Sequence, residues 1–435
     1  MRSVVPLRST SLSASGRLQE IRSGFERSFW VANFTEIFER LAYYGTLAVL
    51  AIYLNEQLHF SAELTGSVIG TFGLVVYFLP VIGGALADRF GFRRALLFAF
   101  AVMTVGYFLL GSLSAGWMQS VRATLGDKWL VVCVLLIPAL GPATVKPCVA
   151  GTTARASKEN VRSLGYSIYY TMVNVGGTLG PLMALLVRKR LGLGSEYVFR
   201  ASALSVFLMF WVILFFYKEP GQKNGEQPAD IGSAVKNMFV VLGNFRFVIF
   251  LLISSGFYIV YWQIYIMAPL FLRGYVDRNM NVDGLLAIEG LAVICLQILI
   301  AYLTRKLPAV PTIALGFCIT GVAFALLALA PSATSFGAML VVIALGEVTQ
   351  ASRYYEYCSR LAPEGQQGLY MGYAFPPIGL GFLVAGWMGG RLLHEFGEVL
   401  HRPSEMWWPI VGVGVATAAL MLLYDKIFKP TRGNM

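Results

Sequence analysis

Hydrophobic residues recur along the chain in long runs that are separated by shorter polar stretches. Most runs approach or exceed 20 residues and contain few charged residues, which is long enough to cross a bilayer core of about 30 Å. Twelve such runs cover residues 28–54, 63–89, 94–113, 129–153, 162–188, 197–217, 246–272, 283–304, 310–329, 334–359, 366–392 and 407–428. The pattern predicts an all-α membrane protein with twelve transmembrane helices.

The largest polar interruption, residues 218–237, is rich in Pro, Gly, Gln and charged residues and is typical of a flexible linker. It divides the twelve runs into two sets of six, which places both termini on the same side of the membrane. The predicted organisation is an N-terminal tail (1–27), a first six-helix bundle (28–217), a linker (218–245), a second six-helix bundle (246–428) and a C-terminal tail (429–435).

Composition and charge agree with a membrane protein. The chain of 435 residues is 57% apolar and only 13% charged, against about 25% charged in soluble domains. The net charge of +11 could indicate a nucleic-acid partner, but the basic residues gather in alternate short loops and in both tails. By the positive-inside rule these loops and both termini face the cytoplasm, although Arg188, Lys189 and Arg190 oppose the trend. We therefore expect the lipid bilayer, and no nucleic acid, as a partner.

The N-terminal tail leaves a second location open. Residues 1–27 are rich in Ser and Arg and poor in acid, a composition that organelle transit peptides share. We favour a cytoplasmic tail and therefore a multi-pass protein of the cell membrane over one of an organelle membrane.

Enzymatic and metal chemistry have little support in the sequence. Five cysteines and three histidines lack the spacing of metal ligands or of a disulfide framework. No phosphate-binding loop or nucleophile–base arrangement is present in a loop. Arg353 and Glu356, three residues apart, predict a local ion pair. We expect no enzyme activity, no metal and no cofactor.

Three ionisable residues lie inside the first hydrophobic run: Glu36, Glu39 and Arg40. Each such group costs about 2.5–3.5 kcal/mol at mid-membrane on insertion scales, so the cluster requires an explanation. Glu36 and Arg40 have the i,i+4 spacing and orientation of a favourable helix pair. Helix rise places Lys146 of the fourth run at a depth from which it can reach these glutamates. A static ion-pair network is one interpretation; we favour a proton-coupling group, with protons as the coupling ion.

A loop motif identifies a resemblance to a known superfamily. Residues 84–94 read GALADRFGFRR and lie between the second and third runs. This sequence resembles the cytoplasmic loop signature of the major facilitator superfamily, which also has two six-helix halves. The resemblance implies that fold, with a substrate site near the membrane midplane between the halves. It also implies a gating role for Asp88, Arg89 and Arg93.

Within that superfamily the chain resembles the proton-dependent oligopeptide transporters. The matching motifs are EIFERLAYYG at 36–45, VKP at 145–147, NVG at 174–176, GE at 346–347 and LAP at 361–363. The resemblance implies proton coupling by Glu36, Glu39, Arg40 and Lys146. It further implies that Glu347 receives the α-amino group of a peptide, and that Tyr43, Tyr44 and Asn174 contact the substrate.

The chain also departs from that family's pattern. Leu47 stands where the family has a second arginine, and Ile266 stands where it has an acid in the seventh helix. The two changes are electrostatically consistent, because losing one partner alone would leave an uncompensated charge. Glu289 is an additional acid that suits a cationic group or a substitute proton site. Trp262 lies in an aromatic cluster that could line a binding site or only pack, and Ala374 replaces an aromatic residue.

Together these features predict a secondary active transporter, a monomer that couples protons to the uptake of small peptides or of peptide-like, amphoteric solutes. One alternative is an exporter or antiporter of a small, cationic solute on the same fold. A second alternative is a membrane sensor that does not transport.

Overall fold

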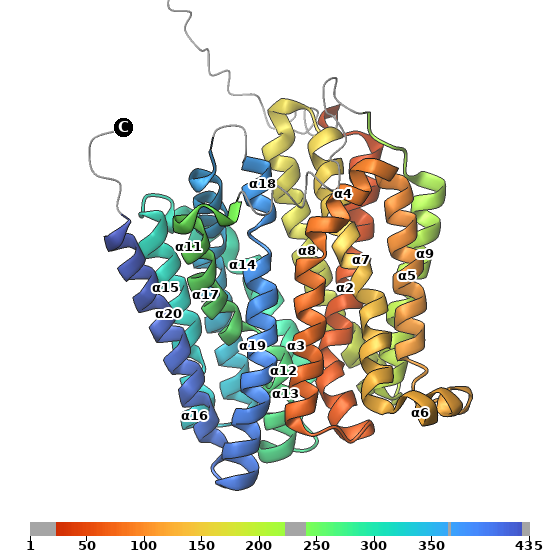
Figure 1. Cartoon of the computed structure of the whole chain (residues 1–435), viewed down its shortest axis with the longest axis vertical. Coiled ribbons are helices and arrows are strands. Elements are labelled where there is room, and N and C mark those ends of the chain that lie inside the picture. The colour runs from red at the N-terminus through yellow and green to blue at the C-terminus, as the bar shows by residue number, and fades with distance from the viewer. Residues whose placement is uncertain (1–22, 222–240, 364–366, 429–435) are drawn as a thin grey trace, which may run out of the picture.

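The computed structural model describes residues 23–221, 241–363 and 367–428, and nearly all of this part of the chain is helical. Figure 1 shows the helices packed side by side into one bundle. Eleven of them are long and apolar enough to cross a membrane, and the shorter apolar helix Ala62–Phe78 supplies the remaining segment. The predicted all-α architecture with twelve transmembrane segments is confirmed.

The helices follow the predicted runs closely. The first half contains α2 (Arg27–Ile52), α3 (Ala62–Phe78), α4 (Pro80–Phe90), α5 (Phe92–Leu110), α6 (Gln119–Leu125), α7 (Asp127–Arg155), α8 (Arg162–Leu185) and α9 (Ser195–Phe216). The second half contains α11 (Phe245–Tyr261), α12 (Gln263–Ile266), α13 (Ala268–Phe271), α14 (Val282–Thr304), α15 (Ala309–Ala323), α16 (Ala325–Leu329), α17 (Ala333–Leu361), α18 (Gln367–Gly372), α19 (Pro376–Leu393) and α20 (Trp407–Ile427). Wider π-helical turns extend α2, α8, α13 and α19 at Tyr53–Gln57, Leu186–Arg190, Leu272–Val276 and His394–Val399. Short 3-10 turns occupy Gly116–Met118, Glu159–Val161 and Pro403–Met406.

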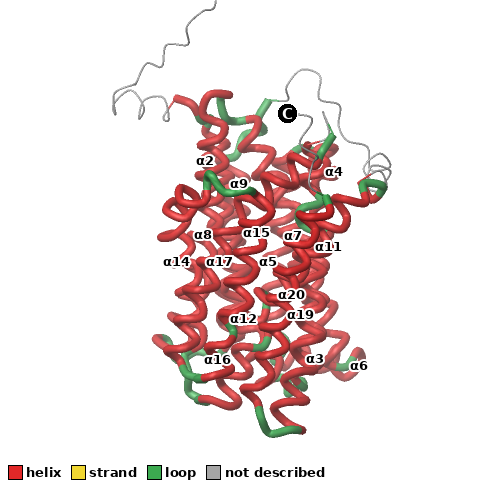
Figure 2. The backbone as a smooth tube through the Cα atoms, turned by 90° about the vertical axis from the view of Figure 1, so that its left-hand side faces the viewer, coloured by secondary structure: helices red, strands yellow, loops and turns green. Residues whose placement is uncertain are grey.

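The helices of the first half lie on the right of Figure 1 and most of those of the second half on the left. Helix α2 begins and α20 ends at the upper end of the bundle, which we call the terminal end; the other we call the far end. Figure 2 shows loops gathered at both ends. The predicted tails lie largely, and the predicted linker mostly, outside the described residues, so these limits remain predictions.

Several membrane segments are broken by proline. Pro80 begins α4, and Pro376 begins α19. The seventh segment is interrupted twice, at Trp262 and at Met267, and Pro269 in α13 has no N–H to donate to a carbonyl of the preceding turn. Such breaks near mid-membrane are tolerated where neighbouring helices cover the backbone, and residues 261–270 are all buried. Trp262, at the first of these breaks, lies at the interface between the two halves, with its ring 6.0 Å from that of Tyr77.

The halves contact each other through small residues. A Cβ atom added to Gly66 of α3 would clash with the carbonyl oxygen of Gly386 of α19. Gly70 and Gly73 of α3 approach the Leu383 carbonyl and the Phe382 ring of the same helix. Glycines at such spacing allow two membrane helices to approach closely and to gain van der Waals contact. The α3–α19 contact is therefore a close backbone interface between the two halves.

We predict that Gly66→Leu destabilises the protein by about 1–3 kcal/mol, because the new side chain must displace the Gly386 backbone. Thermal unfolding in detergent would measure the loss. Gly412→Leu is the matched control, since a Cβ atom at Gly412 meets nothing within 4 Å. An equal effect of both substitutions would contradict the assignment of α3 and α19 as a close-packed interface.

Candidate functional site

The acidic and basic residues of α2 form a buried cluster. Arg40, 2% exposed, donates hydrogen bonds to both carboxylate oxygens of Glu39, with Nη2 lying 2.6 Å from Oε1. Arg40 Nε also lies 3.5 Å from Oε1 of Glu36, so the predicted i,i+4 pair is present. Glu36 is fully buried, and neither of its carboxylate oxygens accepts a hydrogen bond in the described structure. Glu36 therefore has less compensation for its burial than Glu39, the other carboxyl group of this cluster.

Lys146 of α7 lies at the interface between the halves. Its Nζ is 4.1 Å from the centre of the Tyr77 ring of α3 and 5.5 Å from that of Phe375, just before α19. The ammonium group interacts electrostatically with Glu36 and Glu39, but in the described residues it forms no ion pair with either. Two aromatic rings, one from each half, hold the cation in place of a direct carboxylate contact.

The second half contributes a pair of carboxyl groups. Tyr261 of α11 donates a hydrogen bond of 3.2 Å to Oε1 of Glu289, which is on α14 and 6% exposed. Glu347 of α17 is half-buried, interacts electrostatically with Glu289, and has an Oε2 atom without a hydrogen bond. Among the described residues, neither acid forms an ion pair with a lysine or arginine. This pair therefore concentrates negative charge that can bind a cationic group or share a proton.

The aromatic residues predicted from the sequence join the two halves. Tyr44 of α2 contacts Tyr265 of α12 at 5.8 Å between ring centres. Trp262 stacks on Phe382 at 4.1 Å and lies 6.0 Å from Tyr77. Tyr43 is buried beneath the guanidinium of Arg40, which lies 5.1 Å from its ring.

Asn174 is half-buried on α8, and its side-chain amide donates to the Tyr170 carbonyl one turn earlier, at 3.0 Å. No contact of this amide with the other predicted substrate residues is present in the described structure. Its predicted role in substrate contact stays a prediction.

Sequence reasoning did not single out Tyr77 or Phe375. Both contact Lys146, and Tyr77 also contacts Trp262 of the other half. The only local signal was a tyrosine or a phenylalanine shortly before a proline, Pro80 or Pro376. That signal is weak, because aromatic residues are common in membrane helices.

At the predicted gating loop, the side chain of Asp88 is not among those described, and Arg89 is exposed, stacking on Phe90 at 5.6 Å. Arg93 donates a 2.7 Å hydrogen bond to the Leu214 carbonyl of α9. Gly91 adopts a φ of 87°, a conformation that favours glycine. The loop is thus fixed by backbone contacts around α5.

Glu219 is a further residue that sequence reasoning missed. Its two carboxylate oxygens accept hydrogen bonds from the backbone N–H groups of Phe92 and Arg93, each at 2.7 Å. A carboxylate at this position satisfies N–H groups of the first turn of α5 and complements the positive end of its helix dipole. The signal was an acid just after the sixth hydrophobic run.

Leu47 and Ile266, which replace the charged pair of the resembling family, are both buried in apolar surroundings. Ion pairs between the halves occur instead at the far end. Arg188 Nη1, beyond α8, lies 2.7 Å from a carboxylate oxygen of Asp283 at the start of α14. Arg273, beyond α13, pairs with Glu56, beyond α2, at 2.8 Å. Both pairs hold the halves together at the end of the bundle opposite to the termini.

In the described residues, eleven helices long enough to cross a membrane and one shorter apolar helix form two halves, with ionisable and aromatic side chains where the halves meet. This is the architecture of a membrane carrier. Residues 33–386 match the profile of the Major Facilitator Superfamily, and the chain belongs to this superfamily. The predicted fold is confirmed.

Two relatives differ in the extent of the match. The chain is 24% identical over 395 residues to multidrug resistance protein MdtH from Aeromonas hydrophila subsp. hydrophila. This alignment covers 90% of this chain and 94% of that protein. It is 26% identical over 219 residues to dipeptide and tripeptide permease B from Photorhabdus asymbiotica subsp. asymbiotica, which covers 50% of this chain and 42% of the permease.

Solved structures of proton-dependent oligopeptide transporters share the fold. One matches with a TM-score of 0.73 at 17% identity, over 92% of this chain and 98% of the other. A POT family transporter in complex with 5-aminolevulinic acid matches with a TM-score of 0.75 at 16% identity. This match covers 93% of this chain and 97% of that transporter. The similarity to this family that the motifs predict is confirmed at the level of the fold.

The Arg188–Asp283 pair yields a test of how the far end is held closed. Asp283→Asn should leave Arg188 without its charged partner and weaken closure by about 1–3 kcal/mol. Spin labels can be attached to cysteines introduced at Gln57 and Asn279 in a background without other cysteines. Double electron–electron resonance should then report longer label-to-label distances in Asp283→Asn than in the parent protein.

Arg190→Gln is the control, because Arg190 is exposed two residues beyond Arg188 and its replacement also changes the charge at this end of the bundle by one unit. If Asp283→Asn left the distance distribution unchanged, the pair would not be holding this end closed.

Proposed function

We propose that this protein is a secondary active transporter that couples protons to the import of small peptides or other small amphoteric solutes by alternating access. The observation that carries the proposal is Glu36, a fully buried carboxyl group that accepts no hydrogen bond in the described structure. Binding a proton removes the cost of burying its charge and ends its attraction to Arg40. The proton is thereby linked to the charge balance at the interface of the halves.

The charge balance supplies the coupling step. With all four groups ionised, Glu36, Glu39, Arg40 and Lys146 sum to zero, and one proton on Glu36 leaves a net charge of +1. Lys146 then has one carboxylate fewer in its surroundings and attracts an anionic group of a substrate more strongly. Because Lys146 contacts rings of both halves, its change of partner acts where the halves must separate.

The substrate's two ends fit the two halves. A carboxylate can bind near Lys146, and an amino group can bind the acids of the second half, Glu347 and Glu289. We assign substrate contacts also to Tyr43, Tyr44, Asn174 and Trp262, and gating of the terminal end to Asp88, Arg89 and Arg93. The match to solved peptide-transporter structures supports the fold that brings the helices carrying these residues together.

An exporter of cationic solutes is the second candidate. It is favoured by the match to multidrug resistance protein MdtH, which extends over 90% of the chain whereas the permease match covers half. Glu289 and Glu347, which form no ion pair with a lysine or arginine in the described residues, also suit a cationic cargo. Both candidates use protons as the coupling ion and need no other cofactor.

We place the protein in the cell membrane with the terminal end in the cytoplasm, as the distribution of basic loops supports. Arg188, the exception in the charge pattern, forms an ion pair with Asp283 and so has a structural reason to lie on the outer side. In this orientation the far-end ion pairs close the outer face.

The coupling role of Glu36 can be tested by transport in proteoliposomes. A screen of di- and tripeptides by thermal shift would supply the substrate, since a bound ligand stabilises the folded state. Glu36→Gln should lower proton-driven uptake by about 5- to 150-fold, because the proton and substrate sites are no longer linked. Exchange of substrate without a gradient should persist.

Glu63→Gln, the same change at an exposed glutamate of α3, should leave both activities intact. Retention of full proton-driven uptake by Glu36→Gln would contradict the proposed coupling group. Stimulation of uptake by acid inside the vesicle, rather than outside, would favour the exporter.

The role of Glu347 can be tested separately from coupling. Glu347→Gln should weaken binding of a dipeptide by about 10- to 150-fold, because it removes a charged hydrogen-bond acceptor for the amino group. Thermal shift at a series of dipeptide concentrations measures this change, and an N-acetylated dipeptide is the control ligand. Equal binding by wild type and variant would remove Glu347 from the proposed site.

A further inference from the structure

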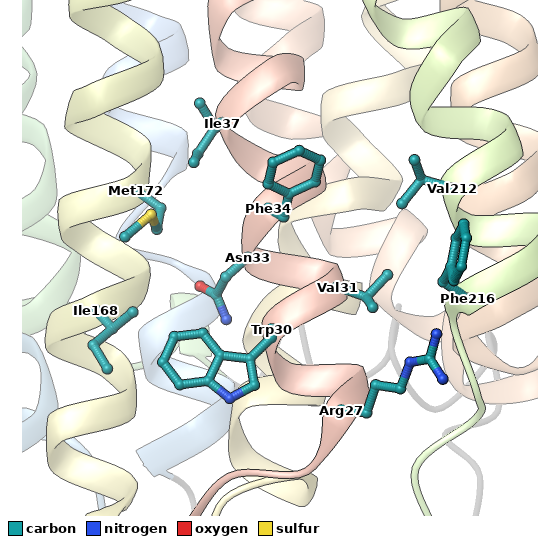
Figure 3. A pocket seen from close by; sticks show the side chains of 10 residues that line it. All are labelled: Arg27, Trp30, Val31, Asn33, Phe34, Ile37, Ile168, Met172, Val212 and Phe216. Atoms are coloured by element: carbon teal, nitrogen blue, oxygen red, sulfur yellow. The ribbon is translucent and has the colours of Figure 1, made fainter. Parts of the chain in front are cut away.

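A groove lies on the outer surface of the first half, away from the interface between the halves. It has a volume of about 410 Å³ and is lined by α2, α8 and α9. Its apolar walls include Trp30, Phe34, Ile168, Met172, Val212 and Phe216. Figure 3 shows α2 as the floor, with the side chains of α8 on one side and those of α9 on the other. None of these residues belongs to the site described above.

One buried polar side chain opens into this apolar groove. Asn33 is 2% exposed, and its Nδ2 donates a 2.9 Å hydrogen bond to the Phe29 carbonyl. Its Oδ1 is buried and has no hydrogen-bond partner, and Nδ2 retains a second hydrogen. A buried amide oxygen without a partner costs about 1–3 kcal/mol, so the groove favours an occupant that brings a hydrogen-bond donor there, either its own or that of a bound water.

The cationic side chain of Arg27 lies at the end of the same groove where α2 begins. Arg27 lines it at the first position of α2, and its guanidinium lies 5.4 Å from the centre of the Phe216 ring. Arg27 forms no ion pair with a carboxylate in the described part of the chain. An unpaired guanidinium where a membrane helix begins lies at the depth of lipid phosphates, with which arginine pairs well.

The spacing of Arg27 and Asn33 along the helix matches the distance between the phosphate and the glycerol ester groups of a phospholipid in a bilayer. Asn33 lies six positions after Arg27, which is about 9 Å along the helix axis. Side chains tilt toward the start of the helix, which brings Asn33 nearer to the headgroup region. Each headgroup layer is about 5–7 Å thick, so a phosphate beside Arg27 places the glycerol ester groups close to Asn33.

We propose that this groove is a binding site for one anionic glycerophospholipid. The phosphate pairs with Arg27, an ester carbonyl accepts the free Nδ2 hydrogen of Asn33, and an acyl chain lies along the apolar walls. Oδ1 of Asn33 accepts from a water that also hydrogen-bonds the lipid. The site does not depend on the transported solute, and it lies on α2 one turn before Glu36.

Native mass spectrometry of the detergent-purified protein tests this site with phosphatidylglycerol and with phosphatidylcholine of the same acyl chains. Wild type should bind phosphatidylglycerol more strongly, by about fivefold for one arginine near an anionic lipid. Arg27→Gln should abolish this preference. Asn33→Leu should weaken binding of both lipids by about two- to tenfold.

Arg305→Gln is the matched control, because Arg305 is also exposed at the terminal end and also stacks on a ring, that of Tyr302 at 4.0 Å. Should Asn33→Leu fail to fold, Met172→Trp fills the groove and keeps both polar residues, and it should likewise reduce binding. Unchanged lipid binding in Arg27→Gln and in the groove variants, or equal loss in Arg305→Gln, would overturn the proposal. Displacement by inorganic phosphate would also do so, because it would indicate a simple anion site.

Discussion

The cost of placing a charge inside a membrane is the constraint on which this structure depends. Arg40 meets it by donating two hydrogen bonds to Glu39, which leaves a compact neutral unit inside α2. The ammonium group of Lys146 is stabilised by aromatic rings, and the arginines at the far end are stabilised by carboxylates of the other half. Glu36 and the Glu289–Glu347 pair are left with less compensation, and these are the positions where a proton or a cationic group changes the energy most.

Contacts between the halves divide into two kinds. Along α3 and α19, backbone lies against backbone at Gly66 and Gly386, a contact whose separation exposes no charged group. At the far end, the Arg188–Asp283 and Arg273–Glu56 pairs add charge-assisted hydrogen bonds, and their groups become hydrated when they separate. A carrier needs both properties, because its closed states must be stable and yet interconvert.

The sequence predicted what depends on local pattern. Hydropathy located the twelve spans, and helix spacing located the Glu36–Arg40 pair, because both follow from residues close in the chain. It did not predict that Tyr77 and Phe375 hold Lys146, nor that Arg188 pairs with Asp283, because these contacts join residues far apart in the sequence. The break at Trp262 was also missed, since it depends on the packing around residues 261–270.

Glu219, which caps α5, affects how the chain passes from the first half to the second. Glu219 lies just after α9, where the segment that connects the halves leaves the first bundle, and its carboxylate is bound to the first turn of α5. The same two hydrogen bonds therefore tie the start of the connecting segment to the loop that joins α4 and α5, which is the predicted gating loop.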